Sequence, residues 1–350
     1  MDFTEKKVFI PSLCGAVICL FFFRSGFLAF FFLVPLGFVA AKYNYSVAWT
    51  SFLFAAIGNA VLTIIPVFSR ATPAIAALLD IVYFSAVTSI FVWIIIPHPI
   101  LPALQGEAIR LFSGSCLGAI IMTLVFIHTI SAPYFSDYME SLVNTLIKAY
   151  RSSGSDVVEA AMIDGYNASA ILEMIKAIML RGGSLVSCTI LFCVSRQISL
   201  FIARLSSKLD KTSLDKTSQD RSNLSSVRTL TAFYVSPTII WFFSSSLLLV
   251  VLTKVLRLHI PEIILWNILI LCVIMYLAQG LGILQFFLTR PSMPPFLRLF
   301  FSVLLIVMFF SPLLNVILLA SLLLLGIAEN WAPLRAYKKD GPSSTPEAGE

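Results

Sequence analysis

Charged side chains are scarce in this chain. Asp, Glu, Lys and Arg together make up 12% of the 350 residues, whereas soluble domains carry about 25%. Apolar residues account for 59%, and the mean hydropathy is +0.94. This composition excludes an ordinary water-soluble globular protein. We therefore expect an integral membrane protein, with the lipid bilayer as its first partner.

The sequence also lacks the short motifs that carry enzyme chemistry. It has no HExxH zinc helix, no GxSxG nucleophile elbow, no GxxxxGK[ST] phosphate loop and no DxxD acidic pair. The three histidines are far apart, and the six cysteines form no CxxC pair. We predict no enzyme activity, no catalytic residues, no metal and no cofactor. The cysteines are interpreted as buried structural thiols, with metal or redox work as the alternative.

Long apolar runs fill the chain instead. Only helices or a closed barrel can span a bilayer, and runs of this length fit helices better than the short alternating strands of a barrel. We predict an all-α fold, a polytopic helical bundle that forms a single membrane domain over residues 1–350. The runs are Val8–Phe23, Ser25–Ala41, Val47–Phe68, Thr72–Ile96, Ile109–Ala132, Ser184–Ala203, Ala232–Val255, Pro261–Leu288 and Leu297–Ile327.

The two ends of the chain make the number of spans ambiguous. The first apolar stretch resembles a signal peptide cleaved after Ala41, but it is too long and is split by Arg24, which favours two short spans and a tight turn. The last run would be about 46 Å long as one helix, against a hydrocarbon thickness of about 30 Å. We expect a break at Ser311-Pro312. A single crossing gives nine spans and an external C-terminus, whereas a hairpin there returns the basic tail to the cytoplasm. The prediction is eight or nine spans.

Three segments differ from the spans. Residues 133–183 contain two amphipathic helices, with apolar residues every three or four positions, expected on the membrane surface or capping the bundle. Residues 205–230 contain three tandem polar pentads and are predicted to form a flexible basic linker. Residues 336–350 are predicted to be a disordered tail.

The basic residues lie mainly at the ends of runs and in the linker. This distribution is typical of topology signals, so the net charge of +6 does not indicate a nucleic-acid partner. The positive-inside bias places the linker and the N-terminus in the cytoplasm and the amphipathic pair outside.

A few polar residues within the runs are the candidate binding residues. An ionisable side chain in a span needs a partner, a cavity or the interface. Asp80 and Arg196 are predicted to face each other across a polar cavity that binds a small solute; the alternatives are an ion pair that ties two helices, or an Arg196 that reaches the interface. Asn59, Gln279 and Gly280 are either helix-packing residues or the lining of a substrate path.

The chain resembles the YybS-like family of bacterial membrane proteins, whose function is not established. The resemblance rests on Phe233-Tyr234-Val235-Ser236-Pro237, on Ala278-Gln279-Gly280-Leu281-Gly282, on the stretch from Leu325 to Arg335, and on Val34-Pro35-Leu36-Gly37 followed by Ala41-Lys42-Tyr43-Asn44. None of these motifs is catalytic, and the pentad linker looks like an insertion. The family is similar in span arrangement to the substrate-capture subunits of energy-coupling-factor vitamin transporters and, more distantly, to the rod-shape protein MreD.

This resemblance implies a multi-pass protein of the bacterial cytoplasmic membrane. It favours small-solute binding or transport, and a separate energising subunit would then be needed because the chain has no nucleotide-binding motif. The alternative is a structural or scaffold protein of the cell envelope that binds other membrane proteins. Likeness of fold alone does not transfer function.

Overall fold

The computed structural model describes residues 3–68, 73–96, 107–152, 168–209, 233–256, 262–290, 293–332 and 334–335, and helix is the regular secondary structure of these ranges. The chain divides into two units. Unit 1 comprises Met1–Val227 and Leu252–Ile270, and unit 2 comprises Arg228–Val251 and Leu271–Glu350. The predicted all-α fold is confirmed for the described residues.

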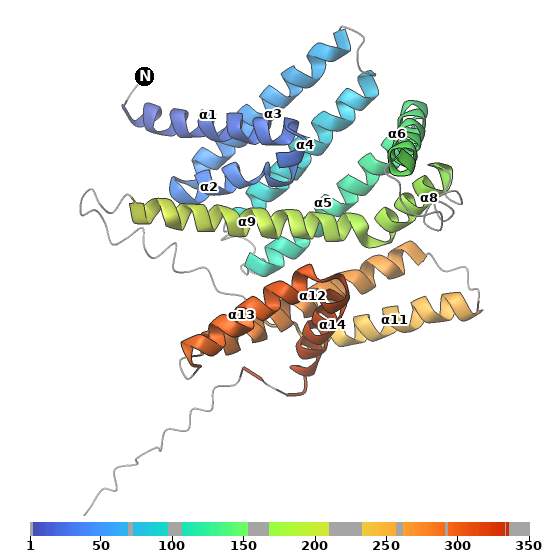
Figure 1. Cartoon of the computed structure of the whole chain (residues 1–350). Helices are drawn as coiled ribbons and strands as arrows, with labels where there is room; N and C mark the ends of the chain where they lie inside the picture. Colours follow the sequence, from blue (N-terminus) through green and yellow to red (C-terminus); the bar gives the residue numbers. More distant parts are fainter. Residues whose placement is uncertain are drawn as a thin grey trace, which may run out of the picture. The chain divides into compact units, whose positions relative to one another are not determined.

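Unit 1 contains most of the long helices (Figure 1). Within it, α1 packs along α3, α3 along α4, α4 along α5, and α9 against both α5 and α2. The bounds of its elements are α1 Phe3–Arg24, the short 3-10 helix η1 Phe27–Phe31, α2 Val34–Lys42, α3 Tyr45–Phe68, α4 Ala74–Ile95, α5 Glu107–Ile130, α6 Pro133–Ser152, α8 Ala168–Ile178, the π-helical turn η3 Met179–Gly183 and α9 Ser184–Leu209.

Prolines set both ends of α4. Pro73 precedes the helix with extended backbone angles (φ −62°, ψ 138°), and Ile96 ends it with φ −77° and ψ 127°. Ile96 comes directly before Pro97, and the residue before a proline is pushed out of the helical region. The carbonyl end of α4 is buried and is capped from α5, because the buried Arg110 Nε donates to the Ile94 carbonyl at 2.9 Å.

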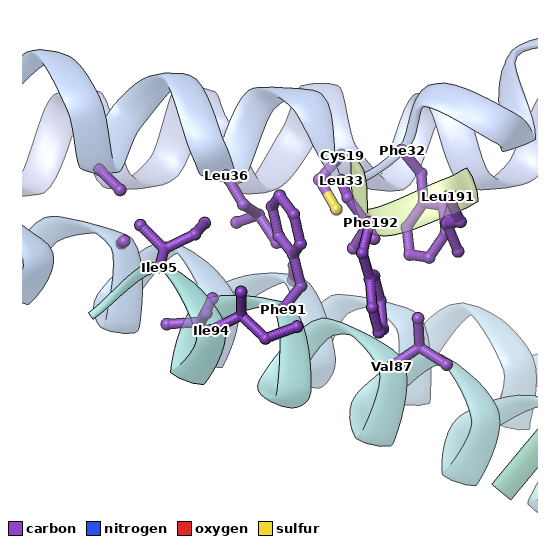
Figure 2. Close-up of a cluster of buried hydrophobic side chains, with 14 of the residues drawn as sticks. Cys19, Phe32, Leu33, Leu36, Val87, Phe91, Ile94, Ile95, Leu191 and Phe192 are labelled. Atoms are coloured by element: carbon purple, nitrogen blue, oxygen red, sulfur yellow. The ribbon is translucent and has the colours of Figure 1, made fainter. Parts of the chain in front are cut away.

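Apolar side chains from α1, α2, α3, α4 and α9, together with Phe32 and Leu33 just before α2, form the core of unit 1 (Figure 2). The Phe91 and Phe192 ring centroids are 6.0 Å apart and join α4 to α9. Phe23, at the end of α1, packs on Phe84 at 4.7 Å. These contacts fix α1 against α4 and so position the residue that follows Phe23.

The amphipathic region breaks where the two glycines stand. Gly182 has φ +119°, a conformation that L side chains rarely adopt, so α8 and α9 are separated by a kink. The carbonyl of Leu180 accepts a 2.8 Å hydrogen bond from Asn267 Nδ2, and Arg181 forms an ion pair with Glu262 at 3.4 Å. The start of α12 (Glu262–Thr289) is thereby fastened to the kink within unit 1.

Two predicted segments are partly described. The amphipathic pair predicted in 133–183 is present as α6 and α8, while their place on a membrane surface stays a prediction. The linker predicted over 205–230 begins too early, because α9 continues as a helix to Leu209. Residues 205–209 therefore belong to α9. The three pentads and the tail 336–350 lie outside the described residues.

Unit 2 is built from parts of α11 (Ile239–Leu256) and α12, and from α13 (Pro295–Phe310) and α14 (Pro312–Ala328). The expected break at Ser311-Pro312 is confirmed: Ser311 is extended (φ −87°, ψ 120°), and α13 and α14 are bent by 116°. The amide of the first helical residue makes no hydrogen bond within the helix, so a proline, which lacks an amide hydrogen, is well suited to the first position of α14.

Within the described ranges, six helical segments are long and apolar enough to cross a membrane, and the bent α13–α14 pair makes a seventh if it counts as one span. The six are α3, α4, Ile109–Ile130 of α5, Glu173–Ser206, α11 and α12. The apolar helices Val8–Arg24 and Phe27–Lys42 are shorter. These helices fit a multi-pass membrane protein, and the count of eight or nine spans, which depends on the short N-terminal pair, stays a prediction.

Candidate functional site

Four polar side chains meet where α1 ends between α3 and α4. Arg24 Nη2 donates to Asn59 Oδ1 at 2.7 Å, to Asp80 Oδ2 at 2.9 Å and to Thr63 Oγ1. Thr63 Oγ1 is also 2.9 Å from Asp80 Oδ2 and 2.7 Å from the Asn59 carbonyl oxygen. We call Arg24, Asn59, Thr63 and Asp80 the Arg24 cluster.

The local structure of each helix explains how these side chains meet. Asn59 and Thr63 are four residues apart on α3, so they lie on the same helix face. Arg24 is the last residue of α1, and the turn after it is stabilised by the Leu28 amide, which donates to Ser25 Oγ at 3.1 Å. The next helix, α4, packs against α3, and its Asp80 Oδ2 lies 2.9 Å from Thr63 Oγ1.

The cluster has a closed inner side and an open outer side. Asn59 is 0% exposed and Thr63 7% exposed, while the side chains of Arg24 and Asp80 are 39% and 30% exposed. Asn59 Nδ2 is buried and has no hydrogen-bond partner in the described part of the chain. A buried amide donor without a partner costs about 1–3 kcal/mol, so this group is the unsatisfied point of the cluster.

The cluster lies well inside the apolar helices. At 1.5 Å per residue, Asn59 is about 21 Å from the start of α3 and about 13 Å from its end. Asp80 is about 9 Å from the start of α4. For helices that cross about 30 Å of hydrocarbon, these positions are below the headgroups. An ion pair that is one-third exposed at this depth needs a polar covering, because lipid tails cannot solvate it.

The expected partnership of Asp80 with Arg196 is wrong. The cation beside Asp80 is Arg24, from α1. Arg196 lies on α9, half-buried and one turn before Ser199, whose hydroxyl donates to the Val34 carbonyl at 2.9 Å. The physical reason is helix packing: α4 lies against α3 and α5, and Phe23 at the end of α1 packs on Phe84 of α4, which places Arg24 beside Asp80.

Gln279 and Gly280 belong to unit 2 and are packing residues there. Gln279 is fully buried; its Oε1 accepts from the Val235 amide at 2.7 Å, and its Nε2 donates to the Gly326 carbonyl at 3.0 Å. A Cβ on Gly280 would overlap the Leu322 carbonyl. The backbones of α12 and α14 therefore touch at these glycines, in the manner of small-residue contacts between membrane helices.

Unit 2 has an ion pair of its own, between Glu329 and Arg335, just after the end of α14. Arg335 donates to Glu329 through Nε and Nη2, both at 2.6 Å, and the two side chains are 12% and 4% exposed. This bidentate pair fixes the segment after α14. Nearby, Asn330 Nδ2 donates to the Tyr276 hydroxyl at 3.4 Å.

The residues that sequence reasoning missed are Arg24, Thr63 and Arg110. Arg24 was interpreted as a charge between two short spans, and an arginine between two apolar runs carries no signal for its partner. Thr63 is four residues after Asn59 in an apolar run. That spacing was the one available clue, since positions i and i+4 share a helix face.

Comparison of the chain with family models, curated proteins and solved structures found no match. The assignment of the site therefore depends on geometry. Among the described residues, no three His, Cys, Asp or Glu side chains come together in a group that could hold a metal ion. The six cysteines are all free thiols. What the Arg24 cluster offers chemically is a set of hydrogen-bond donors around one ion pair.

Proposed function

We propose that this chain is an integral membrane protein that binds a small polar solute at the Arg24 cluster, as a step in solute capture or transport. The observation that carries the proposal is that the buried Asn59 Nδ2, beside an ion pair that is open on one side, has no hydrogen-bond partner among the residues that the structure describes. A purely structural ion pair would be expected to satisfy its neighbours and to be closed.

The proposed setting is the bacterial cytoplasmic membrane, with eight or nine spans and a cytoplasmic N-terminus. Membership in the YybS-like family is part of this proposal and is supported by the motifs quoted above. Because the sequence has no nucleotide-binding motif, transport against a gradient would draw on a separate energising subunit or on an ion gradient. Neither an enzyme activity nor a nucleic-acid partner is proposed.

A structural or scaffold role in the cell envelope is the second candidate. It is favoured by unit 2, where Gln279, Gly280 and Gly326 are packed shut and offer no opening to a solute. In this alternative the partner is another membrane protein. The two candidates make different demands on the Arg24 cluster: a solute site must open to water, whereas a scaffold needs it only as a tie between helices.

The test is co-purification from membranes in mild detergent, with mass spectrometry of small molecules, lipids and proteins. Asn59→Ala removes the unpartnered amide, and Asn267→Ala is the matched control, because Asn267 Nδ2 already donates to two backbone carbonyls. A solute that accompanies the wild type and the control but not Asn59→Ala supports solute binding. Partner proteins without any solute favour the scaffold.

A further inference from the structure

We infer that the solute is a small carboxylate-like anion, and that it binds together with one proton, which Asp80 accepts. This inference rests on the proposed function, because it names the ligand class and the coupling of the same site. It is carried by two features of the Arg24 cluster: which groups lack partners, and how the charges balance in an apolar surrounding.

Within the described residues, most groups of the Arg24 cluster that have no hydrogen-bond partner are donors. Asn59 Nδ2 is buried and has no partner within the described ranges. Arg24 uses Nη2 for all three of its bonds to described residues, so its Nε and Nη1 donate to no acceptor in the described part of the chain. A guanidinium has five N–H donors and no acceptor. A ligand that completes these groups must bring acceptor oxygens, as a carboxylate does.

The charge balance then requires a proton. Empty, the cluster is neutral, because the Arg24 cation is paired with the Asp80 carboxylate at 2.9 Å. An added anion would leave one net negative charge between apolar helices, where water reaches one side of the cluster only and an uncompensated charge costs more than in bulk water. Neutrality returns when a solvent proton forms an O–H bond on Asp80. Arg24 then transfers its ion pair from the neutral Asp80 carboxyl to the anion, and nothing is oxidised or reduced.

The Thr63 hydroxyl can form hydrogen bonds both in the empty site and in the site that holds an anion and a proton. Its hydroxyl is within 2.9 Å of Asp80 Oδ2 and accepts from Arg24 in the empty site. A hydroxyl has one donor hydrogen and two acceptor lone pairs. When Asp80 is protonated, the same hydroxyl can accept from the carboxyl or donate to the anion without moving from the cluster.

Asp80 is the carboxylate of this site. Within the described side chains, Arg24 is the charged group that contacts it. On its own helix, Tyr83 is directed to the Phe23 ring at 6.5 Å. The helix α3 carries no Asp, Glu, Lys, Arg or His. The other titratable side chains described on the elements that pack on α4 form no hydrogen bond or ion pair with Asp80; they are Cys14 and Cys19 on α1, Lys42 on α2, Tyr45 on α3, Arg110, Cys116 and His128 on α5, and Cys188, Cys193, Arg196 and Arg204 on α9.

The experiment measures binding to the purified full-length chain in detergent. The probes are acetate and benzoate, with acetamide and benzamide as neutral controls of the same shape. Calorimetry in two buffers of different ionisation heat counts the protons taken up. We expect both carboxylates to bind with one proton per anion, so that their Kd rises about tenfold for each pH unit over which that proton must be taken up from solution.

Three variants separate the parts of the inference. Asp80→Asn is expected to bind carboxylates with no proton uptake and no pH dependence. Arg24→Gln is expected to lose carboxylate binding at least tenfold. Arg298→Gln is the matched control, since Arg298 is an exposed arginine on α13 whose hydrogen bond within the described residues is to the Arg290 carbonyl at 3.4 Å, and this variant should bind as the wild type does. Because an unpaired charge can impair folding, the neutral double variant Arg24→Gln/Asp80→Asn is compared by circular dichroism.

Each result decides one part. Carboxylate binding without proton uptake, or uptake that persists in Asp80→Asn, overturns the coupling and leaves solute binding intact. Amides that bind as tightly as carboxylates overturn the anion assignment. If none of the four probes binds, the anion inference is overturned, while the proposed function fails only if no small molecule accompanies the wild-type protein from membranes.

Discussion

The pairing of Arg24 with Asp80 predicts a large coupling energy between two residues from different helices. The perturbations are Arg24→Gln, Asp80→Asn and the double variant. Each single change leaves one charge without its partner among apolar helices. An isolated ionised side chain costs about 2.5–3.5 kcal/mol on insertion scales. Both side chains are about one-third exposed, so we reduce this to about 2 kcal/mol for each single variant.

The double variant removes both charges and should cost less than the sum of the two. A neutral Gln and Asn can still hydrogen-bond to Thr63, so we expect a total of about 2 kcal/mol and a coupling energy of about 2 kcal/mol. The assay is the free energy of unfolding in mixed micelles, titrated with sodium dodecyl sulfate and followed by circular dichroism. Arg196→Gln combined with Asp80→Asn is the comparison, and these two changes should add within about 0.5 kcal/mol. A coupling below about 0.5 kcal/mol for Arg24 and Asp80 would refute the pairing.

Two further predictions concern unit 2. Gly326→Ala should lower the free energy of unfolding by about 2 kcal/mol or more, because its Cβ would overlap the Tyr276 carbonyl and a backbone atom cannot turn away. The control is Gly118→Ala, whose Cβ would meet the Phe192 ring edge at 3.2 Å and which should cost less in the same detergent titration. Equal costs for the two variants would contradict the close helix contact. Gln279→Leu should cost about 1–3 kcal/mol because it leaves the buried Val235 amide without its acceptor; an unchanged unfolding midpoint would show that this hydrogen bond is not needed.

Most of the fold could be predicted because the signals for it are local. The third apolar run was expected over Val47–Phe68 and the helix spans Tyr45–Phe68. The fourth was expected to end before Pro97 and does so. The start of the seventh apolar run was predicted less accurately, because the run was expected from Ala232 and α11 begins at Ile239. Pro237 stands in the turn before it, and hydropathy alone does not detect a turn inside an apolar run.

The site could be predicted only in part. Asn59 and Asp80 were selected because polar residues in apolar runs are expensive, and this reasoning is local. Their true cation, Arg24, is 56 residues before Asp80, and the choice between Arg24 and Arg196 depends on which helices pack together. Gln279 was selected by the same rule but is satisfied by backbone groups. A polar residue in a span signals a need for a partner without showing whether that partner is a ligand or the protein itself.

The central claim is that the Arg24 cluster opens to water at the level of the apolar helices. Cysteine labelling in membranes tests it most directly. Asp80→Cys and Val82→Cys lie on the same helix, and Val82 is 44% exposed on the face we expect to contact lipid. A membrane-impermeant anionic methanethiosulfonate reacts only with thiols that reach water. We predict rapid labelling at position 80, aided by Arg24, and none at position 82 above the background of the native cysteines. Absence of labelling at both positions, or equal labelling at both, would contradict a water-accessible site.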